Sequence, residues 1–273
     1  MAKTTPQTSW KLTLEYDGTR YYGWQEQKGA RTVAGEVRRA AEAVLNQPAE
    51  LFGAGRTDAG VHALAQVARL RAARRIKLVD LHHGLNDRLP PDINVLRVEE
   101  AGHTFDPRRD ARARYYLYQI STRRTAFAKK AVWWVKDRLD MEAMQQASAL
   151  LVGRHDFAHF CDKRAGEQST IVVVERAELG RDGDLILFRI GASHFLWKMV
   201  RRLTGALVEI GRGRLNVDEF RRLLEDHRTD RRAHGFEAAA HTAPPSGLFL
   251  ERVVYQGDER PGALIPALAV RRL

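Results

Sequence analysis

Two patterns of hydrophobic and polar positions follow one another along the first half of the chain and predict its elements. Residues 10–16 (WKLTLEY) alternate apolar and polar side chains and stop at Asp17-Gly18, which is typical of a strand that ends in a turn. Apolar side chains then recur every three or four positions over residues 33–45 and stop before Pro48, as in an amphipathic helix. The remaining predicted elements of this half are strands at about 49–54 and 64–71, a helix at about 78–87 and a strand at about 92–99.

The second half repeats this order of strand, helix, strand, strand, helix and strand. Its two main helices have end signals, because Asp140 is a candidate N-cap and Gly153 a stop for the first, and Gly211 closes the second. An extra helix at 217–227 begins with a capping box formed by Asn216 and Glu219. The predicted segments are the strands 113–121, 171–179, 184–191 and 247–255 and the helices 140–153 and 194–211.

Each half therefore predicts a ferredoxin-like, or RRM-like, βαββαβ unit. We expect an α+β fold in which the two halves form a mixed, mainly antiparallel sheet, with helices on one side and a basic cleft between the halves. Residues 102–111 (GHTFDPRRDA) are the expected linker. The expected domains are an N-terminal domain at 1–105 that carries the Asp58 loop, a C-terminal domain at 106–258, and a tail at 259–273.

Composition restricts the class of protein. The chain has 273 residues, enough for two domains with sizeable cores, and 44% of them are hydrophobic. Its apolar runs, such as AVWWV, are far shorter than a membrane span, and its start lacks the apolar core of a signal peptide. Cys161 is the single cysteine, which excludes an internal disulfide and a cysteine-based zinc site. These features lead us to expect a cytoplasmic protein with no membrane association.

The charge balance favours an anionic partner. The chain has 45 Lys and Arg against 34 Asp and Glu, which gives a net charge of +11 and a pI near 10.1. A basic protein of this kind typically binds nucleic acid, and a solvated cationic surface with no partner is the alternative. Arginine dominates the basic clusters, and its planar guanidinium suits bidentate contacts with phosphate.

Residues 53–63 (GAGRTDAGVHA) concentrate side chains that could carry chemistry. They lie between two predicted strands, so Asp58 belongs to a strand-to-strand connection rather than to a phosphate-binding helix start. Three glycines and Thr57 are typical of a loop whose backbone approaches a ligand closely, and Arg56 could neutralise a phosphate. Asp58 could be a nucleophile, a general base, a turn-former, or a metal ligand together with His62, although the metal hypothesis lacks a third ligand nearby.

Two further segments combine basic and aromatic side chains. In residues 111–120 (ARARYYLYQI), strand alternation puts Tyr116 and Tyr118 on one face with Arg112 and Arg114. Such a face suits stacking on nucleic-acid bases if it is open, and half-buried packing is the alternative. In the helix at 194–211, Arg201 lies just off the apolar stripe and could point into a cleft. That stripe consists of Phe195, Met199, Leu203 and Leu207.

The chain resembles the TruA family of tRNA pseudouridine synthases from about residue 10 to residue 256. The resemblance rests on YYGWQ, GAGRTDAGVHA, ARYYLY, FLWKMVR and GLFLERVVY, which occur in this order, and GRTDAGVHA is the most specific of them. It implies isomerisation of uridine to pseudouridine in the anticodon stem-loop of tRNA, at positions 38–40, without cofactor or metal. It also implies a homodimer of two-domain protomers that binds tRNA.

The resemblance also implies roles for single residues. Asp58 corresponds to the catalytic aspartate, Tyr116 to the tyrosine beside the target base, and Arg201 to the basic partner of the aspartate. Arg56 corresponds to the loop arginine that displaces or replaces the flipped nucleotide, and we also expect His62 to contact the substrate. The sequence leaves open whether the carboxylate attacks the ribose, attacks the ring, or removes a sugar proton. A non-catalytic RNA-binding module and a metal-dependent nucleic-acid hydrolase are the alternative functions.

Overall fold

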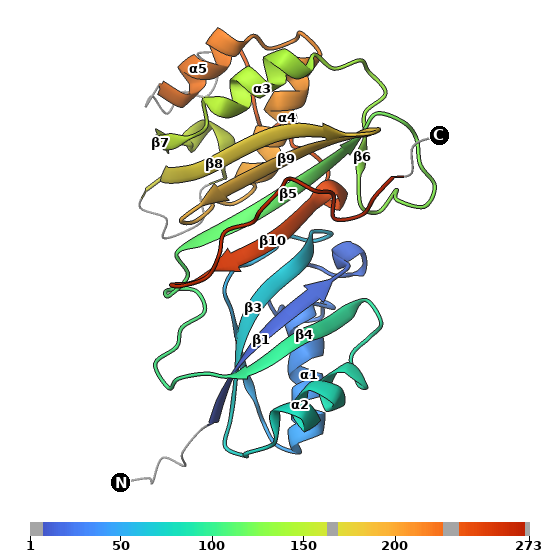
Figure 1. Ribbon diagram of the computed structural model, residues 1–273, viewed down its shortest axis with the longest axis vertical. Helices are drawn as coiled ribbons and strands as arrows, with labels where there is room; N and C mark the ends of the chain where they lie inside the picture. Colours follow the sequence, from blue (N-terminus) through green and yellow to red (C-terminus); the bar gives the residue numbers. More distant parts are fainter. Residues whose placement is uncertain (1–7, 163–168, 226–234, 271–273) are drawn as a thin grey trace. The chain divides into compact units, whose positions relative to one another are not determined.

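The computed structural model describes residues 8–162, 169–225 and 235–270, and it divides the chain into two compact units. The first unit is Met1–Arg112 with Leu250–Asp258, and the second is Ala113–Phe249 with Glu259–Leu273. Both units combine helices with a sheet, so the predicted α+β class is confirmed (Figure 1). Within the described residues, no helix is long and apolar enough to cross a membrane.

The first unit has the predicted order of six elements. They are β1 (Thr8–Tyr16), α1 (Val33–Leu45), β2 (Glu50–Gly53), β3 (His62–Ala72), α2 (Leu78–Asn86) and β4 (Ile93–Glu100). Strand β1 pairs antiparallel with both β3 and β4, and β2 pairs antiparallel with β3. Helix α1 begins where Thr32 accepts a hydrogen bond from the Gly35 amide and ends at Asn46 in the left-handed region. Helices α1 and α2 pack on each other, and α2 packs on β4 (Figure 1).

The second unit contains a mixed sheet in the order β5-β9-β8-β7. Its neighbouring long strands are antiparallel, whereas the short β6 pairs parallel with the end of β5. Helix α3 packs on α4, α5 and β8 (Figure 1). The elements of this unit are β5 (Ala113–Ser121), β6 (Trp133–Trp134), α3 (Met141–Ala149), β7 (Gly153–Asp156), β8 (Ile171–Asp182), β9 (Leu185–Ala192), α4 (Met199–Gly211) and α5 (Val217–Glu225). The last strand, β10 (Leu248–Val254), begins in this unit and continues into the first.

The helix ends of the second unit show which sequence signals held. Asp140 caps α3 by accepting hydrogen bonds from two backbone amides, as predicted. The capping box at α5 is also confirmed, because Asn216 and Glu219 each accept a hydrogen bond from the other's backbone amide. The predicted last two residues of that helix, 226–227, lie outside the described residues. Helix α4 begins at Met199 rather than at 194. Lys198 adopts φ 63°, in the left-handed region, so the right-handed helix cannot extend through it to residues 194–197.

The compact units differ from the expected domains in three places, one of which is the tail at 259–273. The chain joins the second unit at Ala113 rather than at 106, and residues 250–258 return to the first unit. The return is explained by β10, whose neighbour in the first unit is β3, and by the Arg112 amide, which donates to the Val254 carbonyl (2.8 Å). The Tyr255 hydroxyl also donates to the Pro107 carbonyl (2.8 Å).

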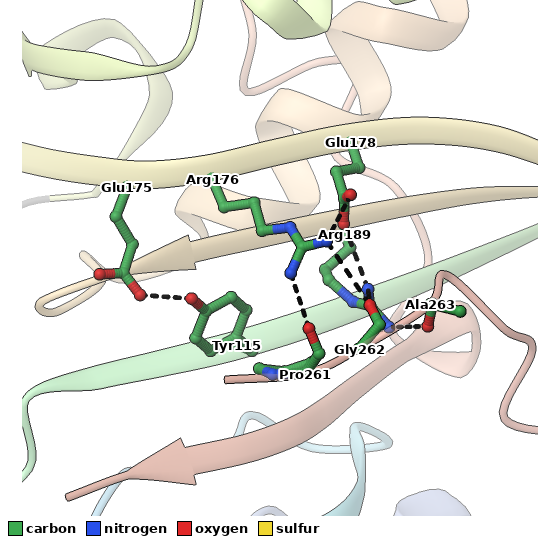
Figure 2. A network of polar contacts seen from close by, with 8 residues as sticks. All are labelled: Tyr115, Glu175, Arg176, Glu178, Arg189, Pro261, Gly262 and Ala263. Atoms are coloured by element: carbon green, nitrogen blue, oxygen red, sulfur yellow. Dashed lines mark hydrogen bonds and ion pairs between the residues drawn. The ribbon is translucent and has the colours of Figure 1, made fainter. Parts of the chain in front are cut away.

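The C-terminal tail is an integral part of the second unit rather than a separate segment. Buried Arg189 donates to the carbonyls of Gly262 and Ala263 (2.9 Å each), and Arg176 donates to the Pro261 carbonyl (2.6 Å). Figure 2 shows both guanidinium groups turned toward the tail backbone, with Glu178 contacting both. These charge-assisted bonds fix the tail on the face of β8 and β9.

Of the two alternatives for the Arg and Tyr face of β5, an open face or packed side chains, the structure has packed side chains. Every residue of β5 is buried, including Tyr116 and Tyr118. Arg114 lies in the same buried face and donates to the Ser193 carbonyl (2.8 Å). Arg112 is exposed and precedes the strand. The covering comes from outside the strand, since Tyr118 packs edge-on against Trp133.

Candidate active site

The Asp58 loop spans residues 54–61 and connects the antiparallel strands β2 and β3, as predicted. Its side chains alternate between outside and inside: Arg56 is exposed, Thr57 is buried and Asp58 is half-buried. A half-buried carboxylate remains reachable by a ligand while the protein limits its movement. The loop therefore has the Arg56 cation and the Asp58 carboxylate on either side of the buried Thr57, which anchors it.

That anchor is a buried polar network under the loop. The hydroxyls of Thr57 and Tyr16 lie 2.8 Å apart in a hydrogen bond. The Gln66 amide nitrogen donates to the Gly55 carbonyl (3.0 Å) and lies 3.5 Å from the Tyr16 hydroxyl. Tyr16, Thr57 and Gln66 are all buried. Hydrogen bonds inside the protein rigidify the groups that they join, so this network fixes the backbone on both sides of Arg56.

A second contact clamps the loop from the segment that follows β1. The Trp24 amide donates to the Thr57 carbonyl (3.1 Å), and the Gly60 amide donates to the Tyr21 carbonyl (3.3 Å). Gly23 has φ +93°, and a Cβ there would lie 2.6 Å from the Thr57 carbonyl oxygen. Residues 21–25 (YYGWQ) therefore hold the Asp58 loop from outside the sheet, a role that could not be predicted from their composition.

The three glycines of residues 53–63, namely Gly53 at the end of β2 and Gly55 and Gly60 in the loop, have different structural reasons. A Cβ at Gly53 would lie 2.4 Å from the Trp24 ring nitrogen, and Gly60 has φ +76°, so packing and backbone conformation explain these two. At Gly55 a Cβ would meet no described atom within 4 Å, and its φ lies outside the left-handed region. Only Gly55, next to Arg56, fits the expectation of a backbone left bare for close approach by a ligand.

His62 has a structural contact at the start of β3. Its ring is buried, and its Nδ1 accepts a hydrogen bond from the Gly18 amide (3.1 Å) and lies 3.1 Å from a carboxylate oxygen of Asp17. The contact fastens the turn after β1 to the end of the Asp58 loop. Among the described residues, no three His, Cys, Asp or Glu side chains form a group that could hold a metal ion. A role of His62 in substrate binding stays a prediction.

In the second unit, Tyr116 lies on β5 against an aromatic partner. The Phe195 ring meets the Tyr116 ring edge-on, with centroids 5.0 Å apart. Edge-to-face contact fixes the plane of both rings, which would orient Tyr116 toward a planar ligand. Phe195 precedes α4 and is half-buried, so its assignment to the core stripe of that helix is wrong. Because Phe195 lies four residues before Met199, its spacing is that of a residue in the same helix, and the contact with Tyr116 could not be predicted from it.

Arg201 lies in the first turn of α4 and is held by the chain that precedes β10. Its Nε donates to the Ala243 carbonyl (2.7 Å), and the Ala243 amide donates back to the Arg201 carbonyl (3.0 Å). Arg201 is half-buried, as a side chain that faces a ligand would be. The carbonyl that orients it lies more than forty positions along the chain, so the periodicity of the helix could not identify this contact.

Arg201 and Tyr116 lie in the same region of the second unit, and Tyr118 connects them. Tyr118 lies two residues after Tyr116 on the same face of β5, and its hydroxyl donates to the Pro244 carbonyl (2.7 Å). Burial raises the pKa of the Tyr118 hydroxyl well above its ordinary value, and the nearby charge of Arg201 opposes this shift only in part. Tyr118 therefore stays protonated and serves as a fixed donor.

A cluster of three charged side chains stabilises the start of α4. Asp162 accepts hydrogen bonds from Lys198 (2.8 Å) and Arg202 (2.5 Å), and its amide donates to the Trp197 carbonyl (3.2 Å). Burial alone would raise the pKa of Asp162, but the bonds from Lys198 and Arg202 hold it below its ordinary value. The cluster stabilises the left-handed conformation of Lys198 and so determines where Arg201 lies in the helix.

The predicted residues thus fall into two groups. Arg56, Asp58 and His62 lie in or next to one loop of the first unit, and Tyr116 and Arg201 lie in one region of the second. The positioning residues Tyr16, Gly23, Gln66 and Ala243 were missed, since each contacts its target through the fold rather than along the sequence. Within the first unit, the Asp58 carboxylate is a group suited to proton transfer or nucleophilic attack.

Comparison with known proteins gives matches over most of the chain. A family model described as tRNA pseudouridine synthase matches residues 13–108 and 147–256. The chain is 39% identical over 251 residues to tRNA pseudouridine synthase A of Brucella ovis and of Brucella canis, which covers 90% of this chain and 97% of each relative. A solved H/ACA RNP bound to a substrate RNA containing 2′-deoxyuridine gives a TM-score of 0.36 at 10% identity, over 73% of this chain and 44% of that chain. The archaeal box H/ACA sRNP Nop10-Cbf5 complex gives a TM-score of 0.32 at 13% identity, over 74% and 42%.

Proposed function

The chain belongs to the tRNA pseudouridine synthase family, and from that membership we propose that it modifies uridines at positions 38–40, in the anticodon stem-loop of tRNA. The activity of the family is an isomerisation of uridine to pseudouridine. The observation that carries the proposal is the anchored loop, which holds Asp58 half-buried beside exposed Arg56 within the matched residues.

The reaction needs a carboxylate but no change of oxidation state. The bond between ribose carbon 1′ and uracil nitrogen 1 breaks, the uracil turns, and carbon 5 forms the new bond to the same ribose carbon. The proton on carbon 5 is lost to a base, and nitrogen 1 ends with a proton, so atoms and electrons balance. Asp58 is the proposed nucleophile or base, because the loop network limits its movement while leaving it accessible.

The target uridine must leave its stack before Asp58 can reach it. Extruding a base costs a few kcal/mol, which protein contacts must offset. Arg56 is the proposed replacement for the extruded nucleotide, since it is exposed and its neighbour Gly55 leaves space beside it. Tyr116, with its ring oriented by Phe195, is proposed to pack on the uracil. Arg201 is proposed as the cationic partner of the Asp58 carboxylate, and His62 as a contact to the substrate.

The proposal extends to partners and location. A net charge of +11 supports binding of tRNA through its phosphates. By the resemblance we include a homodimer, which sedimentation of the pure protein with and without tRNA would test. A cytoplasmic location is part of the proposal, since that is where a tRNA substrate is met. No cofactor or metal is included, because the isomerisation is redox-neutral and the carboxylate supplies the reactive group.

The test is an assay on tRNA that carries tritium at carbon 5 of uracil, with and without a chelator. Because carbon 5 loses its hydrogen in the isomerisation, the synthase releases tritium in both conditions, and mapping of the product places pseudouridine at 38–40. Strand cleavage that stops with chelator would support a metal-dependent hydrolase instead. Binding of tRNA with neither reaction would support a non-catalytic RNA-binding module, and pseudouridine at other positions would refute the assignment to the anticodon stem-loop.

A further inference from the structure

Residues 122–138 of the second unit form a loop with an unusual apolar exposure. Phe127 is 103% exposed and Trp134 is 46% exposed. Leaving an aromatic side chain in water forgoes roughly 1.5–3 kcal/mol of burial, and such exposure marks interaction sites when it is clustered. The two rings lie in a single stretch of seventeen residues, TRRTAFAKKAVWWVKDR, which we name the aromatic–basic loop.

The loop is anchored at its base, so the exposure of Phe127 does not come from a loose segment. The fully buried Gln119 donates to the Ala131 carbonyl (3.0 Å), and the Ala131 amide donates to the Ala128 carbonyl (2.8 Å). The Ser121 hydroxyl donates to the Arg123 carbonyl (2.7 Å). Ala128 and Ala131 are buried. The fold therefore holds the residues on both sides of Phe127 and directs its ring into solvent.

The charges around the rings favour an anionic partner. Arg124, Lys129 and Lys130 are exposed, and the Arg124 guanidinium lies over the Trp134 ring at 5.9 Å. The loop contains one acidic residue, Asp137, and that carboxylate is paired with Arg212 (2.7 Å). Cations interleaved with open aromatic rings are the combination that binds unpaired nucleotides, where the rings stack on bases and the cations contact phosphates. A contact between this loop and the same loop of a second copy would place like charges against one another, which is unfavourable.

We propose that the aromatic–basic loop binds an unpaired nucleotide of the tRNA substrate, with Phe127 stacked on the base and Arg124, Lys129 and Lys130 on the flanking phosphates. This inference rests on the proposed function for the identity of the RNA. None of these residues is among those assigned to the reaction, so the loop is a binding site in addition to the Asp58 loop. It supplies affinity for tRNA and takes no part in the isomerisation.

The test uses substitutions at Phe127, which can be changed without disturbing packing because its side chain is fully exposed. Phe127→Ala and Phe127→Leu should weaken tRNA binding about tenfold, whereas Phe127→Trp should bind as well as the original protein. The single-turnover rate at saturating tRNA should stay unchanged. Lys129→Gln should lower the slope of log K against log salt by about one, and Phe127→Ala should leave that slope unchanged. Val79→Ala, at a 53% exposed position on α2, is the control and should change nothing.

Three results would overturn the inference. The first is wild-type tRNA affinity in Phe127→Ala, and the second is equal affinity in Phe127→Leu and Phe127→Trp. The third is a fall to a smaller oligomer in sedimentation of Phe127→Ala without RNA, which would assign the loop to contacts between copies. All three are separate from failure of the proposed function, which would appear as absence of pseudouridine with the unsubstituted protein.

Discussion

Gln66→Met is the substitution that tests whether the buried network positions the Asp58 loop. Gln66 is 0% exposed, its Nε2 donates to the Gly55 carbonyl (3.0 Å), and its Oε1 accepts from the Val67 amide (3.2 Å). Met has nearly the same shape, so the substitution removes the amide without leaving a cavity. It removes both hydrogen bonds of the Gln66 amide, each of which contributes about 0.5–1.5 kcal/mol, so together they contribute about 1–3 kcal/mol. We expect the free energy of unfolding to fall by that amount.

The same substitution should slow the reaction, because the backbone next to Arg56 and Asp58 is then free to move. Small misplacements of reacting groups cost large factors in rate, so we expect a loss of about tenfold or more in single-turnover conversion at saturating tRNA. Affinity for tRNA should barely change. Urea denaturation measures the stability, and tritium release from tRNA measures the rate.

Asn86→Leu is the matched control in the same unit. The Asn86 amide also bonds a backbone carbonyl and a backbone amide, both of Val95, but it joins α2 to β4 and does not contact the loop. It should lose a similar amount of stability and keep the wild-type rate at saturating tRNA. If Gln66→Met and Asn86→Leu lose the same stability and both keep that rate, the network has only a structural role.

Three further predictions address other parts of the account. Tyr116→Phe keeps the ring and its contact with Phe195 but loses the hydroxyl, so if that hydroxyl takes part in proton transfer, turnover should drop ~10²-fold while tRNA affinity stays. Near wild-type turnover would restrict Tyr116 to stacking. Gly23→Ala should destabilise the protein and slow the reaction more than Gly29→Ala, because both have positive φ but only at Gly23 would the Cβ meet the Thr57 carbonyl, at 2.6 Å. Equal effects in denaturation and single-turnover assays would show that the clamp is dispensable. The affinity for tRNA should fall linearly in a plot of log K against log salt, and a flat response between roughly 50 and 200 mM would refute phosphate contacts as its main source.

The sequence was most informative where an element depends on local pattern alone. Helix α1 was predicted at 33–45 and observed as Val33–Leu45, because its apolar period and the proline beyond it agree. The start of α4 was predicted too early, because Phe195 continues the helical spacing while Lys198 adopts a left-handed conformation stabilised by Asp162. Strands β6 and β7 have two and four residues, too few to show a period.

The candidate site divides in the same way. Asp58 and Arg56 were identified from the composition of their loop and from the family resemblance, and the structure holds that loop between two strands as expected. The groups that hold it could not be predicted, since Tyr16 and Gln66 lie 41 and 11 positions from the atoms that they bind. The sequence could not decide between an open and a packed face of β5, because the residues that this face contacts are distant in sequence: Ser193 lies 79 positions from Arg114, and Trp133 lies 15 positions from Tyr118.

Single-turnover pseudouridine formation by Asp58→Asn is the measurement that tests the central claim most directly. Asn is nearly isosteric and serves turns as well as Asp, so the fold, the melting temperature and tRNA binding should persist. It cannot act as a carboxylate nucleophile or base, and we therefore expect conversion at background level with tRNA fully bound. Measurable conversion by pure Asp58→Asn protein, shown by mass spectrometry to be free of deamidation to Asp, would contradict the assignment of Asp58 to the chemistry.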